Sequence, residues 1–419
     1  MRAGTLFRLV LMGLAGTLAL PTVVSALALK GPAAGARAAD GDPAVIATVS
    51  VGDYPYSVAV NPSTNRIYVA NAGSDGVLVI DGATNAVVAT VPADGDPAVN
   101  PNTNLIYLAN GNTGNVSVID GASNTVVATV AVGLEFGGPA VNPSTNRIYL
   151  RNRWGNKVSV IDGASNTVIT SVAVGALPEA VAVNPSTNLI YVTHALSGNV
   201  SVIDGVSNTV VASVAVGLMP LGVAVNPSTN RIYVANYHSP KVSVIDGVSN
   251  TVVATIAVGI DPGGVAVNPS TNRIYVLNSQ SDNVSVIDGA SNTVVATVAV
   301  GSVPCAVAVD PSTNRIYVAN CNDDTVSVID ATVPPEPTDT VTPGPPVPPT
   351  PAPPPATPTS SNLPGVGGNV MPPSTGIAAE PRGSAGGSGW TVGAYAALAG
   401  LGTAVAIGGA WYAKRKRAA

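Results

Sequence analysis

Charged side chains are scarce in this 419-residue chain: Asp, Glu, Lys and Arg together make up 10% of it, and aromatic residues 4%. Long surface helices need Glu, Lys and Arg, so this scarcity favours many short strands joined by tight turns. Basic residues are especially few within residues 40–330, which carry 20 acidic and 9 basic side chains. A nucleic-acid partner is therefore disfavoured, because binding to phosphates needs a basic field.

Long uncharged runs lie at the two ends of the chain. Residues 1–38 begin with Arg2 and Arg8 around an apolar run and continue into small residues, which is typical of a secretory signal with cleavage after Ala26, Ala28 or Ala38. Residues 390–412 contain no charge and are long enough to cross a bilayer. The basic tail 413–419 follows directly and is expected to stay cytoplasmic. We expect an extracytoplasmic protein on a single-pass membrane anchor, although a buried core helix is the alternative interpretation of 390–412.

Residues 331–389 form a linker rich in Pro, Gly and Ser. Within it, residues 334–358 hold 13 prolines in 25 positions. Such a stretch favours an extended polyproline spacer of about 75–80 Å, which would lift a domain away from a membrane. The segment MPPSTG (371–376) resembles a degenerate sortase signal, so covalent attachment to a cell wall is an alternative to the membrane anchor.

Residues 42–330 repeat one phrase seven times. PSTNRIYVAN, or a close variant, starts at 62, 101, 143, 185, 227, 269 and 311, at spacings of 39 and then 42 residues. Each unit reads as four short strands rich in Val, Ile, Tyr and Thr, separated by turns such as NPSTN and DGASN. A period near 42 with four strands per unit predicts an all-β propeller of seven blades.

The ends of the array predict how the ring closes. The array opens with AVIATVSVG (44–52), which matches the fourth strand of a unit, and it stops after VSVID (326–330), which is a third strand. The seventh unit therefore lacks a fourth strand. We expect residues 44–52 to complete it, which closes the ring and covers an open edge.

The phrases IYVAN and IYVTH, together with VxVIDxxxNxVVATVxVG around them, resemble the YVTN-type β-propeller repeat. The resemblance covers residues 42–330 and rests on a tyrosine in every unit, followed three places later by Asn or, in the fourth unit, by His194. It implies a seven-bladed propeller in a bacterial or archaeal secreted or surface-layer protein. The family has no shared catalytic residues, so the resemblance implies no activity.

Two further patterns have structural interpretations. An aspartate ends each third strand, at positions 81, 120, 162, 204, 246, 288 and 330, and precedes Gly in six of the seven units. A ring of cation-binding carboxylates is possible there, but capping of a tight turn by the side chain is the better explanation. Cys305 and Cys321 both fall in the seventh unit, across its first hairpin, and in an exported protein this favours a disulfide.

Most of the domain's unusual side chains occur in two sets of variable loops, one before each first strand and one between the second and third strands. In a propeller both sets emerge on the same face. They carry Glu135 and Glu179 and the side chains that we predict as binding residues: Tyr54, Tyr56, Phe136, Arg151, Arg153, Trp154, His194, Tyr237 and His238. Aromatic and Arg side chains in such loops are typical of recognition surfaces. The alternative is sequence variation in loops that no function constrains.

The second and third units also differ from the other units in the sequence of their inner strands. Pro97 and Pro139 stand where the fourth unit has Val181, and the linker into the second unit is three residues short. Proline removes a ladder donor, so we expect an irregular rim beside the aromatic patch.

The sequence thus predicts a monomeric, surface-anchored propeller that binds a protein or glycan in adhesion or envelope assembly, without a cofactor or bound metal. The alternative is a lyase or lactonase-like enzyme that uses the same face. His194 and His238 would serve it, but no dense His/Glu cluster, HExxH motif or phosphate-binding loop supports that alternative.

Overall fold

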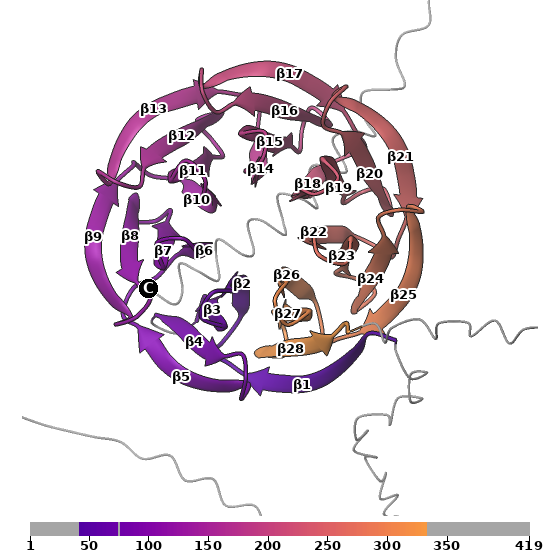
Figure 1. Ribbon diagram of the computed structural model, residues 1–419, viewed down its shortest axis with the longest axis horizontal. Coiled ribbons are helices and arrows are strands. Elements are labelled where there is room, and N and C mark those ends of the chain that lie inside the picture. The colour runs from indigo at the N-terminus through magenta and orange to yellow at the C-terminus, as the bar shows by residue number, and fades with distance from the viewer. Residues whose placement is uncertain (1–41, 74–75, 333–419) are drawn as a thin grey trace, which may run out of the picture. The chain divides into compact units, whose positions relative to one another are not determined.

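In the part of the chain that the structure describes, twenty-eight strands form seven four-stranded antiparallel sheets around one axis (Figure 1). This computed structural model describes residues 42–73 and 76–332. The predicted signal, the basic tail, the span 390–412 and all of the linker except residues 331 and 332 lie outside these residues. Within them, no helix is long and apolar enough to cross a membrane.

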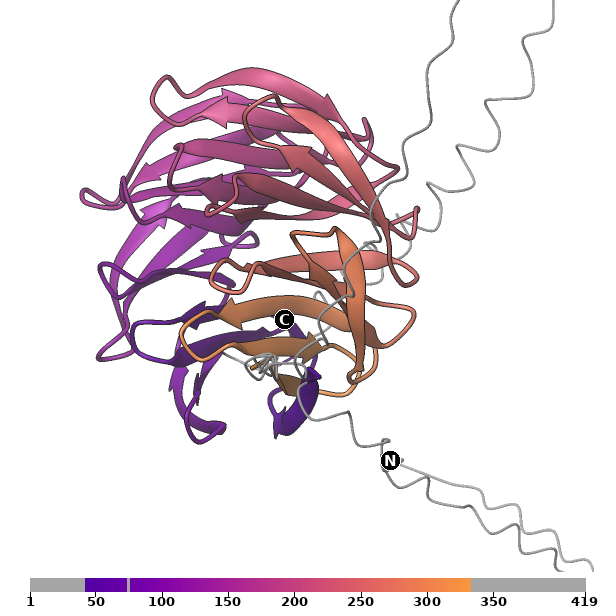
Figure 2. The ribbon, with the colours of Figure 1, turned by 45° about the vertical axis from the view of Figure 1, so that its right-hand side comes forward.

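Seen obliquely, the sheets stand side by side around the axis (Figure 2). The inner strands are β2 (Pro55–Asn61), β6 (Asp96–Asn100), β10 (Phe136–Asn142), β14 (Pro178–Asn184), β18 (Pro220–Asn226), β22 (Pro262–Asn268) and β26 (Pro304–Asp310). The second strands are β3 (Arg66–Asn71), β7 (Leu105–Asn110), β11 (Arg147–Asn152), β15 (Leu189–His194), β19 (Arg231–Asn236), β23 (Arg273–Asn278) and β27 (Arg315–Asn320).

The outer half of each sheet completes the blade. The third strands are β4 (Val77–Asp81), β8 (Asn115–Asp120), β12 (Lys157–Asp162), β16 (Asn199–Asp204), β20 (Lys241–Asp246), β24 (Asn283–Asp288) and β28 (Thr325–Asp330). The outer strands are β5 (Ala86–Val91), β9 (Thr125–Ala131), β13 (Thr167–Ala173), β17 (Thr209–Ala215), β21 (Thr251–Ala257), β25 (Thr293–Ala299) and β1 (Ala44–Ser50).

The predicted ring closure is confirmed. The last sheet has the order β1-β28-β27-β26, with β1 antiparallel to β28 and Val49 opposite Val326. Residues from the two ends of the array thus share one sheet, and seven blades complete the circle.

The core lies between blades. Each hydrophobic cluster joins two neighbouring sheets, as where Tyr68 and Val79 of the first blade pack with Ile106 and Leu108 of the second. The second strands are almost wholly buried because they face neighbouring sheets on both sides, which explains why their sequence is the most uniform. The apolar contacts that hold one blade are therefore supplied by the next.

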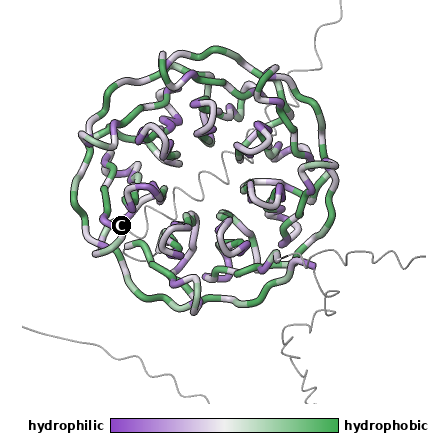
Figure 3. Tube along the Cα trace, in the orientation of Figure 1, coloured by the Kyte–Doolittle hydropathy of each residue, from purple (hydrophilic) through white to green (hydrophobic). Residues whose placement is uncertain are grey.

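The outer strands form an apolar rim. Each has two adjacent exposed aliphatic side chains, such as Val126 and Val127, which are 42% and 56% exposed. Figure 3 shows hydrophobic residues along this outer ring of strands. A register shift interrupts the pairing of all seven of these strands with the third strands, and this twists the open edge.

One face of the ring is built from two repeated turns, which we call the repeated face. The last Asn of both NPSTN and DGASN adopts a left-handed conformation, with φ of 52° at Asn65 and 57° at Asn85. This conformation favours Asn over other residues with a Cβ. Because each turn requires a residue in this conformation, the same turn residues recur in every blade.

The turn interpretation of the third-strand aspartates is confirmed. Asp120 Oδ1 accepts hydrogen bonds from the N–H groups of Ala122 and Ser123 at 2.9 and 2.8 Å, and the other blades repeat the motif. The backbone hydrogen bond from Ser123 holds the pKa of Asp120 below its usual value, aided by the Ser123 hydroxyl. Among the described residues, no group of three or more His, Cys, Asp or Glu side chains is arranged to hold a metal ion.

An amide belt links the blades on the repeated face. The first Asn of each NPSTN turn donates Nδ2–H to the last Asn of the next blade's turn, as from Asn61 to Asn104 at 2.7 Å and from Asn226 to Asn272 at 2.7 Å. Six such bonds run around the ring. At the closing seam Asp310 replaces Asn, and Asn65 Nδ2 donates to Asp310 Oδ2 at 3.3 Å once its amide is oriented for that contact.

The predicted disulfide is confirmed. Cys305 in β26 and Cys321 just after β27 are bonded, with their Cα atoms 5.9 Å apart. The bridge joins the two innermost strands of the blade that closes the ring, and Cys321 Sγ lies 3.0 Å from the carbonyl oxygen of Pro55 in the first blade.

Candidate functional site

The opposite face carries the two sets of variable loops, and we call it the variable face. The backbone before the inner strand is nearly the same in six of the seven blades. A residue in the left-handed conformation precedes six of the inner strands: Tyr54, Glu135, Leu177, Met219, Asp261 and Val303. Such a conformation costs about 1–2 kcal/mol for a residue with a Cβ, so something must hold it.

Hydrogen bonds between the two sets of loops hold this conformation. The carbonyl of the left-handed residue accepts from the residue after the second strand, as from Tyr237 N to Met219 O at 3.0 Å and from Ala195 N to Leu177 O at 3.2 Å. Its own N–H often bonds to the preceding blade, as from Tyr54 to Asp324 Oδ1 at 2.8 Å. The variable face is thus a regular backbone on which side chains differ.

Blade three presents the densest group of charged and aromatic side chains on this face. Arg153 donates to Glu179 Oε1 from Nη2 at 2.7 Å and from Nε at 2.9 Å, which ties the loop of blade three to the inner strand of blade four. Arg153 Cζ also lies 5.6 Å from the centre of the Trp154 ring, within cation–π range. Trp154 remains 65% exposed. An ion pair therefore positions an aromatic ring that faces solvent.

Arg151 lies nearer the axis, in β11, paired with Gly137 of β10. A Cβ added at Gly137 would lie 3.5 Å from Arg151 Nη2, and one added at Gly138 would lie 3.1 Å from Arg151 Nε. The two glycines of the inner strand thus leave the space that the guanidinium occupies. Asp96 of blade two reaches the same place, where its Oδ2 accepts the Gly138 N–H at 2.9 Å.

Two predicted binding residues are not in exposed loops. His194 is the last residue of β15 and is fully buried, and Phe136 is the first residue of β10, 6% exposed, within the core between blades two and three. Phe136 occupies the position that Pro178 holds in blade four, which explains its burial. The expectation that both side chains lie on the recognition surface is corrected.

His194 replaces the asparagine that ends the second strand in other blades. In blade five Asn236 donates Nδ2–H to Ser243 Oγ at 3.0 Å, and in blade four His194 Nε2 contacts Ser201 Oγ at 2.8 Å. Burial lowers the pKa of His194 to about 4. The imidazole is thus a neutral structural substitute for an amide.

The remaining predicted residues form separate groups. Tyr237 and His238 contact each other on blade five, with ring centroids 5.2 Å apart, and His238 is exposed. His194 and His238 are not at equivalent positions, since His238 lies two residues past the one that aligns with His194. Tyr54 and Tyr56 flank the start of β2 in blade one, where Tyr56 packs against the core. The structure therefore brings Arg151, Arg153 and Trp154 to one blade but does not gather all nine residues.

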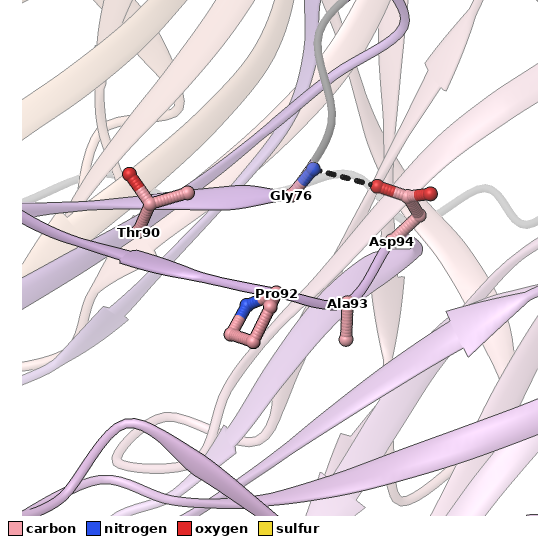
Figure 4. Close-up of a pocket in the computed structure, with 5 residues that line it drawn as sticks. All are labelled: Gly76, Thr90, Pro92, Ala93 and Asp94. Atoms are coloured by element: carbon pink, nitrogen blue, oxygen red, sulfur yellow. Dashed lines mark hydrogen bonds between the residues drawn. The ribbon is translucent and has the colours of Figure 1, made fainter.

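The inner strand of blade two, which follows the shortened linker, is irregular as expected. The inner strand β6 has five residues where the others have seven, and Pro97 pairs directly with Leu108. A small hollow lies at this linker, lined by Gly76, Thr90, Pro92, Ala93 and Asp94, with Gly76 N–H bonded to Asp94 Oδ1 at 2.8 Å (Figure 4). In blade three, by contrast, Pro139 lies within a register shift like that of blade four.

Comparison with known proteins supports the fold alone. No family model matches the chain, and no curated protein sequence matches it. The structure of Kuenenia stuttgartiensis hydrazine synthase is similar, with a TM-score of 0.60 and 20% identity over 68% of this chain and 98% of that one. The chain is thus a seven-bladed β-propeller, and its likeness to YVTN-type repeats stays a resemblance of sequence pattern.

Sequence reasoning missed the part played by Asp96, Gly137 and Gly138, and it did not anticipate the ion pair of Glu179. A signal for the glycines was present: the two units with a long side chain at this strand position, Arg151 and Leu277, are also the two with a Gly-Gly pair in the inner strand. The pairing of the two strands makes that coincidence meaningful.

Proposed function

We propose that this chain is an exported, membrane-anchored binding protein that displays a propeller at the cell surface. The variable face is its recognition surface, and its partner is a glycan or a protein of the cell envelope. The resemblance to YVTN-type repeats, the predicted signal and the predicted span support the location.

One observation carries the proposal: side chains are the same from blade to blade on one face of the ring and differ from blade to blade on the other. On the repeated face the same turns, aspartates and amide belt recur from blade to blade. On the variable face the backbone recurs but the side chains do not, and the exposed Trp154 is fixed there by Arg153 and Glu179. A rigid scaffold under variable side chains is what recognition surfaces use.

Trp154 and Arg153 are the expected centre of the contact. Trp and Arg dominate binding energy at interfaces because each offers a large surface and directed polar atoms. Trp154 gains no core packing from its position, since it is mostly exposed. Its ring is free to stack on a sugar or a side chain of the partner.

The test begins with finding the partner. The full-length chain is used in a glycan array and in a pull-down from cell-envelope extract, beside a variant with Arg151→Ala, Arg153→Ala and Trp154→Ala. We expect ligands that wild type captures to be lost by the triple variant. Capture that survives all three substitutions would remove blade three as the site.

A second variant controls for general surface effects. Val206 and Val248 are 81% and 83% exposed in turns of the repeated face. Replacing both with Ala alters exposed side chains on the opposite face and should leave capture unchanged. The enzyme alternative has no comparable support, because His194 is buried in blade four and only His238, in blade five, is exposed.

A further inference from the structure

Arg151 occupies a position where six blades have a side chain without charge. The corresponding residues are Ala70, Ala109, Thr193, Ala235, Leu277 and Ala319. This position is the fifth of the second strand, one step inside the variable face. A guanidinium there is a change that the repeat itself does not require.

Among the arginines that the structure describes, Arg151 differs in its polar contacts. Arg66, Arg147, Arg231 and Arg273 pair with the aspartates that end the third strands, Arg153 pairs with Glu179, and Arg315 bonds to a backbone carbonyl. Within residues 42–73 and 76–332, Arg151 is the one arginine without an ion pair or a hydrogen bond. Its Nε is buried and unpaired. A buried polar atom left unpaired costs about 1–3 kcal/mol, so a ligand that supplied an acceptor here would gain free energy.

The inner strand of blade three is adapted to this guanidinium. Gly138 has φ of 54°, a conformation that favours glycine, and a Cβ at that position would press on Arg151 Nε. Asp96 lies on the same side of the strand, but its Oδ2 is used by the Gly138 N–H and it forms no ion pair with Arg151. The site thus holds one unneutralised donor group beside one fixed acceptor.

We propose that Arg151 binds the carboxylate of an acidic sugar, with Trp154 as the platform for a sugar ring; this rests on the proposed function of the variable face. A guanidinium matches a carboxylate in shape and donates two parallel hydrogen bonds to it. Arg153 does not share this role, because Glu179 already neutralises it.

A uronate fits the site better than an acidic peptide does. Asp96 and Glu179 lie near the arginines, and their negative charge would repel a chain of adjacent carboxylates. The same carboxylates accept hydrogen bonds from sugar hydroxyls. Arg151, with Asp96 as a nearby acceptor and the exposed Trp154 three residues further along the chain, therefore matches one carboxylate among several hydroxyls.

The probe is an oligosaccharide of neutral sugars that carries a single galacturonate, compared with the same oligosaccharide after methyl esterification of its one carboxylate. Binding to the full-length chain is measured by titration calorimetry. We expect the acidic form to bind at least about tenfold more tightly, and Arg151→Ala to abolish that preference, in line with the usual worth of a charged hydrogen bond. Lys241→Ala removes one positive charge from the same face on blade five and should change the affinity less than about twofold.

Three outcomes would overturn this assignment while leaving the proposed function open: equal affinity for acidic and esterified oligosaccharides, unchanged binding by Arg151→Ala, or tighter binding of poly-glutamate than of galacturonate. Absence of binding to either oligosaccharide would also overturn the uronate assignment. The proposed function would then be decided by the glycan array and the pull-down. Arg151→Gln, which keeps polar hydrogens without charge, replaces the Ala variant if thermal unfolding shows that the latter is destabilised.

Discussion

At the scale of single residues, position within the repeat decides which role a side chain takes. The same strand position holds Asn236 in one blade and His194 in another, and both lie against a serine of the third strand. A close approach by the backbone accompanies both: a Cβ at Gly175 would lie 2.9 Å from His194 Cγ, and one at Gly217 would lie 2.5 Å from Asn236 Cγ. Histidine here packs in the place of an asparagine.

His194 predicts a specific acid sensitivity. Its pKa is about 4 in the folded chain because burial disfavours the charged ring, whereas an unfolded histidine titrates near 6.5. Above pH 6.5 the ring is neutral in both states. As the pH falls from about 6.5 towards 4, the unfolded chain binds the proton first, so the free energy of unfolding decreases, by roughly 2 kcal/mol.

The measurement is chemical denaturation of wild type and of His194→Asn at pH 7.5 and pH 4.5. The variant restores the residue found in most other blades and should lose less stability over this range. The third-strand aspartates, whose pKa values are lowered, act in both proteins alike and weaken the fold mainly at still lower pH. Equal losses in the two proteins would show that His194 does not titrate as a buried ring.

At the scale of elements, the sequence predicted the strands well and the side-chain environment of their ends less well. Alternating Val, Ile and Tyr between NPSTN and DGASN turns suffices for the four strands, because each turn demands the left-handed Asn that the phrase supplies. Burial at strand ends depends on the neighbouring blade. Hence Phe136 and His194 were expected on the surface, although each occupies a position that is buried in other blades too.

The candidate site was predictable in part for the same reason. The composition of the variable loops predicted Arg151, Arg153 and Trp154 as binding residues, and these residues do lie on one blade. Which arginine is neutralised could not be predicted, because Glu179 belongs to the next blade and lies 26 residues away along the chain.

The amide belt should make a measurable contribution to stability. Asn226 is fully buried, donates to Asn272 Oδ1 at 2.7 Å and accepts from Ser228 N at 3.0 Å. Asn226→Ala removes both bonds and leaves their partners unsatisfied, so we expect the free energy of unfolding to fall by about 1–3 kcal/mol.

Asn226→Asp is the matched variant for the belt. It imitates Asp310 at the ring seam, where an aspartate accepts from Ser312 N at 2.9 Å. It keeps the acceptor for Ser228 and should cost less than Asn226→Ala in the same denaturation experiment. A loss below about 0.5 kcal/mol for Asn226→Ala would mean that the belt follows from the packing of the blades and does not hold them together.

At the scale of the whole molecule, one short strand closes the ring. Val49 of β1 is 8% exposed and packs with Ile67 and Val326 at the seam between the last and first blades. Val49→Asp would bury an unpaired charge there, and we expect a loss of at least about 3 kcal/mol together with faster hydrogen exchange in β28.

Ile46→Asp supplies the control within the same strand. Ile46 is 48% exposed on the outer rim, so an aspartate there stays in water and should cost no more than about 0.5 kcal/mol. Similar effects of the two substitutions would contradict the closure of the ring by β1 as a source of stability.

The central claim is that the variable face, at blade three, is where this molecule binds its partner. The most direct measurement is the affinity of the full-length chain for a captured partner, compared with that of the Arg151→Ala, Arg153→Ala, Trp154→Ala variant and the Val206→Ala, Val248→Ala variant. We predict that the first variant loses at least about tenfold in affinity and that the second stays within about twofold of wild type. Undiminished affinity in the first variant, with all three proteins equally folded, would contradict the account.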